Sequence, residues 1–197
     1  MNPRTPLVYL LRHGQTEWSL SGQHTGLTDI PLTEKGKKEA SLIAAGIHDV
    51  SFVKAFSSPL SRALETAQLA HLNCPIETRT DLLEWDYGEY EGIKTKDILI
   101  KNPGWNLFDH GAPRGENLDE VAKRADHIIR EIRNINGDVA VISHGHYLRV
   151  FAARWLLQPP LFGKLIYLNT ASISIVGYEH NMQEPIIKTW NSICHLK

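Results

Sequence analysis

The sequence predicts an α/β sandwich in which a largely parallel central β-sheet is covered by helices on both faces. Two observations carry this prediction. Short apolar runs alternate along the chain with longer segments of helical periodicity, and the strand expected at 138–143 has the continuous apolar run of a strand buried on both faces. Strands that alternate with helices form a mainly parallel sheet between two helical layers. The order of the strands in the sheet is left open.

The strands are recognised as short apolar and β-branched runs bounded by turn residues. In chain order they cover residues 7–11, 51–58, 75–79, 138–143, 171–180 and 184–191. The first is wholly apolar (LVYLL), the second (SFVKAFSS) leads directly into a helical segment, and the third (PIETR) is short. The last two are expected to form a closing hairpin around His180 and Asn181.

The helices are recognised by apolar residues that recur every three or four positions. In chain order they cover residues 31–47, 59–72, 116–135 and 145–157. Thr33 is the expected N-cap of the first helix, and Pro59 suits the first turn of the second. Residues 81–116 are rich in glycine, aromatic and acidic residues without a long period, so we predict an irregular insertion with a short helix near 94–101.

Length and composition predict a single domain over residues 1–197 with no nucleic-acid or membrane partner. Of the 197 residues, 42% are hydrophobic and 22% charged, which suits a folded core. The formal net charge of −1 lacks the basic excess of a nucleic-acid binder. No secretory signal pattern or membrane-length apolar run is recognised, and Cys74 and Cys194 are isolated. We therefore expect a cytoplasmic protein whose oligomeric state the sequence leaves open.

Three of the predicted strands end in residues that suit an anionic ligand. These ends are Arg12-His13-Gly14, Ser57-Ser58-Pro59 with Arg62 one helical turn later, and Ser143-His144-Gly145. If the strands are parallel neighbours, two arginines and two histidines meet at the sheet edge where α/β proteins bind ligands. Such a group of cations suits a phosphoryl group. Each residue alone is more simply an ordinary solvated strand end.

A proton donor is expected in the acidic segment 82–92 (LLEWDYGEYEG). Desolvation by an aromatic neighbour raises the pKa of a carboxyl group and allows it to donate a proton near neutral pH. Trp85 and Tyr87 are such neighbours, and Glu84 and Asp86 are the nearest carboxyl groups in the sequence. A solvated acidic loop is the alternative interpretation.

Four segments, in order along nearly the whole chain, resemble the signatures of the histidine phosphatase superfamily, also called the phosphoglycerate mutase-like family. They are LLRHGQTEWSLSGQHTGLTDIPLTEKG (10–36), SSPLSRALETA (57–67), LLEWDYGEYEG (82–92) and VISHGHYLRV (141–150). The resemblance implies a three-layer α/β sandwich in which the insertion 81–116 lies over the active site.

The resemblance also assigns roles to individual positions. It implies that His13 is the nucleophile and that Glu84 is the proton donor, for which Asp86 is the second candidate. It also implies that the phosphate pocket is formed by Arg12, Arg62 and His144. The implied substrate-binding residues are Gln15, Ser19, Gln23, Thr25, Gly26, Gly145 and His146. Ser19 stands where the family often has Asn. Arg114 is a candidate for a second anionic contact, or a solvated loop residue. No metal or other cofactor is implied.

The short insertion and the closing segment 144–149 resemble the phosphatase branch, which includes sedoheptulose-1,7-bisphosphatases and bacterial acid phosphatases. This resemblance implies a phosphoric monoester hydrolase that acts on a small phosphorylated metabolite, such as a sugar phosphate or bisphosphate, through a phosphohistidine. The alternatives are a phosphoglycerate mutase, which passes the phosphoryl group to a second substrate position, and a non-enzymatic protein that binds a phosphorylated ligand. The identity of the substrate stays open.

Overall fold

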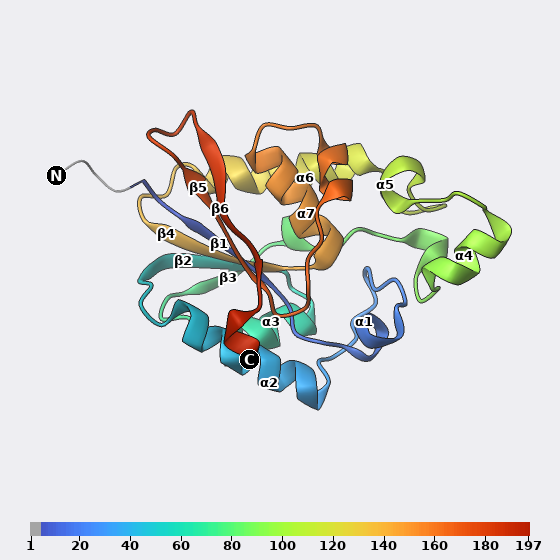
Figure 1. Cartoon of the computed structure of the whole chain (residues 1–197), viewed down its shortest axis with the longest axis horizontal. Helices are drawn as coiled ribbons and strands as arrows, with labels where there is room; N and C mark the ends of the chain where they lie inside the picture. Colours follow the sequence, from blue (N-terminus) through green and yellow to red (C-terminus); the bar gives the residue numbers. More distant parts are fainter. Residues whose placement is uncertain (1–4) are drawn as a thin grey trace.

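A six-stranded sheet organises the chain, as the computed structural model in Figure 1 shows for the described residues, 5–197. The strands are β1 (Val8–Arg12), β2 (Phe52–Ser57), β3 (Ile76–Thr78), β4 (Asp138–Ser143), β5 (Ile173–Tyr178) and β6 (Pro185–Ser192). Their order is β3-β2-β4-β1-β5-β6. Among the strand pairs within residues 5–197, only the two that include β5 are antiparallel. The predicted strands and the mostly parallel sheet are therefore confirmed.

Two helices cover each face of the sheet (Figure 1). On one face lie α2 (Glu34–Ile47) and α3 (Ser61–Leu69), and on the other lie α6 (Leu118–Ile132) and α7 (Gly145–Trp155). Side chains alternate along each strand, so Leu10 packs in the core under α6 and α7 and Leu11 in the core over α2 and α3. This alternation confirms the predicted sandwich with three layers.

The helix ends follow the predicted caps with one exception. The Thr33 hydroxyl accepts a hydrogen bond from the Gly36 N–H at 3.0 Å and caps α2, as expected. The prediction that Pro59 lies in the first turn of α3 is wrong. Leu60 is the extended N-cap of that helix, and the backbone N–H and hydroxyl of Ser61 both bond to Asp29 outside it. Because these bonds fix Ser61 as the first residue of the helix, α3 begins two residues after Pro59.

Residues 81–116 are irregular, as predicted, and the expected short helix is present as α4 (Thr95–Lys101). Helices α1 (Glu17–Ser21) and α5 (Leu107–His110) were not predicted, because four or five residues are too few to show a helical period. In Figure 1, α4 and α5 extend to one side of the sheet, on the side where α1 lies. The 3₁₀ helices are η1 (Thr80–Leu82), η2 (Gly88–Tyr90), η3 (Pro160–Leu165) and η4 (Cys194–Leu196).

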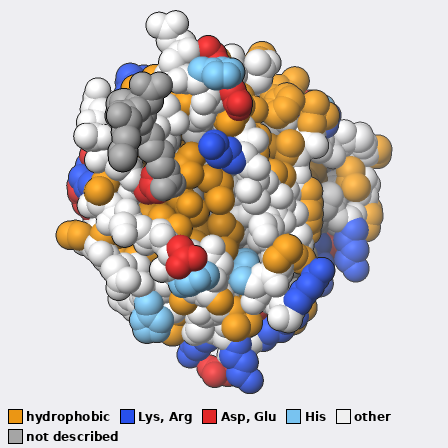
Figure 2. Space-filling view, turned by 60° about the vertical axis from the view of Figure 1, so that its left-hand side comes forward, with side chains coloured by type: hydrophobic (Ala, Val, Ile, Leu, Met, Phe, Trp, Pro, Cys, Tyr) orange, Lys and Arg blue, Asp and Glu red, His pale blue; other side chains and the backbone are white. Residues whose placement is uncertain are grey.

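Strand β6 forms one edge of the sheet, and most of its residues are half-buried. Lys188 is its exposed residue, and a charged side chain on an edge strand opposes pairing with another chain. Figure 2 shows hydrophobic side chains across the middle of one face of the molecule. Within residues 5–197, no helix combines the length and the apolar character needed to cross a membrane.

Candidate active site

The three predicted strand ends lie side by side. Strand β4 is hydrogen-bonded to β1 on one side and to β2 on the other, and both pairs are parallel. This arrangement brings residues 12–14, 57–58 and 143–145 to the same edge. The rings of His13 and His144 are consequently 5.1 Å apart between their centroids. The convergence predicted from the sequence is confirmed.

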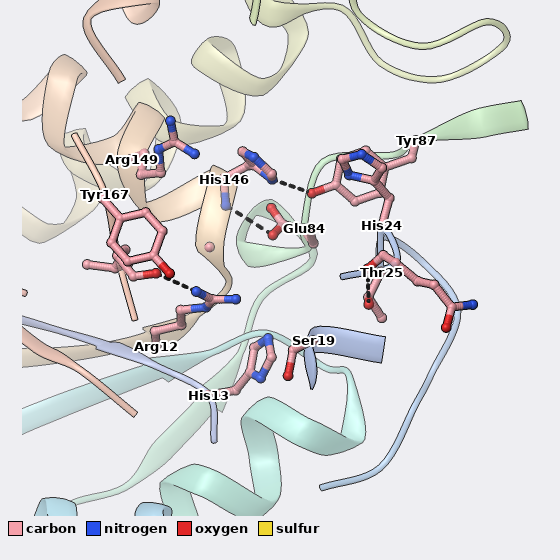
Figure 3. A pocket seen from close by; sticks show the side chains of 13 residues that line it. Arg12, His13, Ser19, His24, Thr25, Glu84, Tyr87, His146, Arg149 and Tyr167 are labelled. Carbon is pink, nitrogen blue, oxygen red and sulfur yellow. Dashed lines mark hydrogen bonds between the residues drawn. The ribbon is translucent and has the colours of Figure 1, made fainter. Parts of the chain in front are cut away.

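A cavity of about 220 Å³ opens at this edge of the sheet (Figure 3). It is lined by Arg12, His13, Ser19, Gln23, His24, Thr25, Glu84, Tyr87, Gly145, His146, Arg149, Tyr167 and Leu168. Eight of the twelve residues proposed from the sequence are in this lining. The other four, Gln15, Gly26, Arg62 and His144, lie outside it.

His13 is held in one tautomer with one ring nitrogen open to the cavity. Its Nδ1 lies 2.7 Å from the carbonyl oxygen of Gly14, and because a carbonyl can only accept, Nδ1 carries the proton. Among the described residues, Nε2 has no hydrogen-bond partner. Burial, followed by the nearby Arg62 and Arg12 cations, lowers the pKa of His13 well below its ordinary value. The ring is therefore neutral at neutral pH, with the Nε2 lone pair available.

The glycine after His13 is required by a close backbone approach. A Cβ on Gly14 would lie 2.3 Å from the carbonyl oxygen of Gly36, in the first turn of α2. The Gly14 N–H donates to the Thr66 hydroxyl at 3.1 Å, and that hydroxyl donates to the Arg62 carbonyl at 2.7 Å. The position of His13 is thus set by α2 and α3 together.

Arg12 presents its guanidinium to the cavity, and no carboxylate within residues 5–197 lies within ion-pair distance of it. Its Nη1 donates to the Leu168 carbonyl, and its buried Nε has no partner among the described residues. A Cβ on Gly145 would lie 3.1 Å from the Arg12 Cζ, so a larger residue at the start of α7 would crowd the guanidinium. Arg12 therefore retains N–H groups that can bind an anion.

Arg62 and His144 lie behind the cavity rather than in its lining, and both are fully buried. Arg62 donates to the carbonyl oxygens of Thr28, Thr25 and Gly26 at 3.0, 3.3 and 2.8 Å. Its Nε donates to His144 Nδ1 at 3.2 Å. His144 Nε2 must then carry the proton, and it lies 2.8 Å from the Ser58 hydroxyl. Burial and the Arg62 cation lower the pKa of His144 well below its ordinary value.

Glu84 lies at the N-terminus of α7 and is buried, with 4% of its surface exposed. Its Oε1 accepts from the Tyr147 and Trp85 N–H groups at 2.8 and 2.9 Å, and its Oε2 accepts from the His146 N–H at 3.1 Å. A carboxylate complements the positive end of the helix dipole there. The carboxyl group is thus held at the cavity wall by the backbone.

The loop that carries Glu84 is anchored by Arg124 on α6. The Arg124 guanidinium donates to the carbonyl oxygens of Asp81 and Leu83 at 2.8 and 2.9 Å and forms a two-pronged ion pair with Glu116 at 2.7 Å. Asp86, the second candidate for the acid, forms a hydrogen bond within a turn, where its Oδ1 accepts from the Gly88 N–H at 2.8 Å. Asp86 is not among the residues that line the cavity.

One wall of the cavity is built from neutral rings. Tyr87 Oη and His146 Nδ1 are 2.6 Å apart, and burial raises the pKa of Tyr87 and lowers that of His146, each well away from its ordinary value. The His24 ring packs 4.8 Å from that of Tyr87, and burial lowers the pKa of His24 to about 4. Trp105 and Phe108 support this wall from behind, against His24 and His146 respectively.

The predicted substrate-binding residues divide into two groups. Ser19, Gln23 and Thr25 line the cavity, although Ser19 also forms the capping box of α1 with Thr16. Gln15 lies outside the lining, where its Oε1 accepts from the Thr33 hydroxyl at 3.1 Å. Gly26 is buried, and a Cβ there would lie 2.6 Å from both the Glu91 carboxylate and the Trp85 carbonyl.

Several lining residues were not proposed from the sequence: His24, Tyr87, Arg149, Tyr167 and Leu168. Arg149 is the last residue of the closing segment 144–149, and no role was assigned to it from the sequence. Its spacing was an available signal, because Arg149 is four residues after Gly145 and therefore lies on the same helix face. Tyr167 and Leu168 come from the segment before β5, and no local pattern marks them.

No group of three or more histidine, cysteine, aspartate or glutamate side chains within residues 5–197 could hold a metal ion. The fold and the cavity define a class of α/β protein that binds anions at the carboxyl edge of its parallel strands.

Comparison with known proteins places the chain within that class. A family model described as the histidine phosphatase superfamily (branch 1) matches residues 8–193. An acid phosphatase of Mycobacterium tuberculosis is 38% identical in an alignment of length 189 that covers 93% of this chain and 92% of that protein. Sedoheptulose 1,7-bisphosphatase of Saccharomyces cerevisiae is 36% identical in an alignment of length 185 that covers 77% of this chain and 68% of that protein.

A solved structure of an open reading frame product from Mycobacterium tuberculosis has the same fold. It superimposes with a TM-score of 0.88 at 36% identity, over 95% of this chain and 98% of that one. The chain belongs to the histidine phosphatase superfamily, as its sequence motifs predicted.

Proposed function

We propose that this protein hydrolyses phosphomonoesters of small metabolites, with His13 carrying the phosphoryl group between two half-reactions. The observation that carries the proposal is the state of His13. Its Nδ1–H is committed to the Gly14 carbonyl, its ring is neutral because burial lowers its pKa, and its Nε2 is open to a cavity that Arg12 also lines. A neutral, oriented imidazole beside a free cation is suited to attack on phosphorus.

In the first half-reaction, His13 Nε2 forms a bond to phosphorus and the ester P–O bond breaks. Arg12 stabilises the negative charge on the transferring oxygens directly, and the buried Arg62 and His144 hold the wall behind them. Glu84, in its protonated form, donates a proton to the departing alkoxide.

In the second half-reaction, the Glu84 carboxylate accepts a proton from water while the water oxygen attacks the phosphohistidine. The P–N bond breaks, inorganic phosphate leaves, and the neutral ring and the protonated carboxyl group are restored. Acid and base are therefore the same residue used in turn. The similarity to an acid phosphatase and a sugar bisphosphatase supports a hydrolytic outcome.

The test is to trap the intermediate. Protein is mixed with p-nitrophenyl phosphate under single-turnover conditions, quenched in base, and examined for acid-labile, base-stable phosphohistidine. It should appear in the wild type and be absent from His13→Ala. In Glu84→Gln it should accumulate, because p-nitrophenolate leaves without a proton whereas the attack of water still needs a base.

The control is His180→Ala, on the turn between β5 and β6 at the opposite edge of the sheet, which should retain wild-type turnover. The proposal is wrong if the His13→Ala variant is active and the wild type forms no phosphohistidine. A comparison of water with added phosphoglycerate as phosphoryl acceptor distinguishes a hydrolase from a mutase, since a mutase would phosphorylate the added acid.

A further inference from the structure

The loop between α1 and α2 lies between two side chains of opposite charge. On one side, Arg62 donates to the carbonyl oxygens of Thr25, Gly26 and Thr28. On the other side, Glu91 Oε1 accepts from the Gly26 and Thr28 N–H groups at 2.9 and 3.1 Å, and its Oε2 accepts from the Gly26 N–H at 3.0 Å. The loop therefore connects Glu91, in the insertion, to Arg62, behind the cavity.

Arg62 and Glu91 bind opposite ends of one peptide group. The Thr25 carbonyl and the Gly26 N–H belong to the same peptide, and in a trans peptide these two groups point in opposite directions. Arg62 Nη2 lies 3.3 Å from that carbonyl oxygen, and Glu91 Oε1 lies 2.9 Å from that backbone nitrogen. Hydrogen bonds in such a series polarise and strengthen one another. The contact made by Glu91 therefore affects how firmly Arg62 is held.

The contact between Glu91 and the loop is close. Gly26 is buried and Glu91 is half-buried, and a Cβ on Gly26 would lie 2.6 Å from the Glu91 carboxylate. Nearby backbone N–H groups that converge on one carboxylate form an anion-binding nest. The anion in this nest is a side chain of the protein itself, so the nest serves to join two segments of the chain.

Backbone pairing joins the same two segments beside Glu91. The Gly92 N–H donates to the His24 carbonyl at 2.8 Å, and the His24 N–H donates to the Ile93 carbonyl at 3.0 Å. Gln23 forms an antiparallel bridge with Lys94, and its side-chain amide donates to the Gly92 carbonyl at 2.9 Å. Gln23 and His24 both line the cavity. The insertion and this cavity-lining loop are thus one connected unit.

Neutralisation of the Arg62 charge is not what Glu91 supplies. Asp29 lies nearer to Arg62, with its Oδ1 4.0 Å from Nη1, and its side chain is 48% exposed. Glu91 is separated from Arg62 by a peptide group and bonds to backbone N–H groups only. What Glu91 adds is therefore the placement of the peptide groups whose carbonyl oxygens hold the guanidinium.

We propose that Glu91 is a positioning residue for phosphoryl transfer, because its hydrogen bonds to Gly26 and Thr28 fix the carbonyl groups that place Arg62 in the wall behind the cavity. The insertion also carries Glu84, so the same contact fixes the acid and the arginine relative to each other. This inference rests on the proposed function, because it assumes that phosphoryl transfer occurs at His13.

Two substitutions separate the hydrogen bonds of Glu91 from its charge. Glu91→Gln removes the charge but keeps the length and one acceptor oxygen, which is sufficient because Oε1 alone accepts from both Gly26 and Thr28. Glu91→Asp keeps the charge but is shorter by one methylene group. Glu89 provides the matched control, because it is exposed and pairs with the exposed Arg114 at 2.6 Å.

The measurement is kcat and KM for p-nitrophenyl phosphate. In Glu91→Asp, kcat/KM should fall about 10- to 100-fold, as expected for a small displacement of groups that support the reacting atoms. Glu91→Gln should keep most of the wild-type value, and the same two substitutions at Glu89 should change nothing. The proposal is overturned if Glu91→Asp is as active as Glu91→Gln, or if both variants equal the wild type.

A double-mutant cycle tests whether Glu91 acts through Arg62. Arg62→Lys keeps the buried charge but cannot form the same set of hydrogen bonds. In that background Glu91→Asp should cost less than about threefold further in kcat/KM, because residues that act through one network are not additive. A loss as large as in the wild-type background would mean that Glu91 affects turnover by another route, and would overturn the proposal.

Failure of the proposed function would look different, because the wild type would then not hydrolyse p-nitrophenyl phosphate. Calorimetric titration with orthovanadate, which can adopt the five-coordinate geometry of a phosphoryl group in transfer, would still test the placement of Arg62. Glu91→Asp should bind orthovanadate more weakly than Glu91→Gln does. Equal affinities of the wild type and both variants would overturn the inference independently of turnover.

Discussion

Replacement of Arg62 by glutamine should lower both the activity and the stability of the protein. Arg62 is fully buried behind the cavity, and its guanidinium donates to three backbone carbonyl groups and to His144. These carbonyls belong to Thr25, Gly26 and Thr28, in the segment between α1 and α2. Glutamine is too short and has too few donors to restore the four hydrogen bonds.

The size of the effect follows from these contacts. Four hydrogen bonds from a charged donor are lost, each worth about 1.5–3 kcal/mol when it is made, while removal of a buried cation returns part of that free energy. A net loss of about 3–5 kcal/mol in the free energy of unfolding is expected, the range for broken buried ionic contacts. For a chain of this length, each kcal/mol lowers Tm by roughly 2–4 °C, so Tm should fall by about 6–20 °C.

Urea denaturation followed by tryptophan fluorescence measures the loss, and Arg12→Gln is the comparison. The Arg12 guanidinium forms one hydrogen bond within residues 5–197, to the Leu168 carbonyl, so its replacement should lower the free energy of unfolding by only about 1–2 kcal/mol. Both variants should lose roughly 100- to 1000-fold in kcat/KM. If Arg62→Gln loses no more stability than Arg12→Gln, the hydrogen bonds of Arg62 do not support the cavity wall as argued.

Two further predictions concern stability. His13, His24, His144 and His146 are neutral in the folded protein because burial lowers their pKa values from 6.5, whereas the unfolded chain binds protons below that pH. The free energy of unfolding should therefore fall as the pH decreases below about 6.5, by up to about 1.4 kcal/mol per pH unit for each histidine. Equal urea midpoints at about pH 7.5 and about pH 5.5 would contradict this expectation. Gly36→Ala should destabilise by about 1–3 kcal/mol or more, because the new Cβ would lie 2.1 Å from the Gln15 carbonyl; a Tm equal to that of the wild type would contradict it.

The fold was readable from the sequence where elements are long and periodic. The continuous apolar run of β4 and the spacing of apolar residues in α2 and α6 reflect which face of each element is buried. Such a pattern can be recognised within the segment itself, without knowledge of distant contacts. Helices α1 and α5 were missed because they are too short for a period. The start of α3 was misplaced because its first residue, Ser61, is held by Asp29, a contact across 32 positions.

The chemical identity of the site was likewise a property of the sequence. Arg-His-Gly after one buried strand and Ser-His-Gly after another predicted a meeting of cations at one edge, and the parallel order β2-β4-β1 realises it. Such convergence needs only that the strands be neighbours, because the ends of parallel strands fall at the same edge. The roles of the individual residues remain a proposal.

Tertiary structure alone decided which side chains line the cavity. The sequence could not show that Arg62 and His144 bond to each other behind the cavity, or that backbone N–H groups of α7 hold Glu84. Nor could it place Arg149 inside the cavity and Arg114 outside it. The physical reason is that a side chain points where its distant contacts allow. For Arg149 those contacts are the carbonyl groups of Gly163 and Lys164 and the ring of Phe108, none of them a neighbour in the sequence.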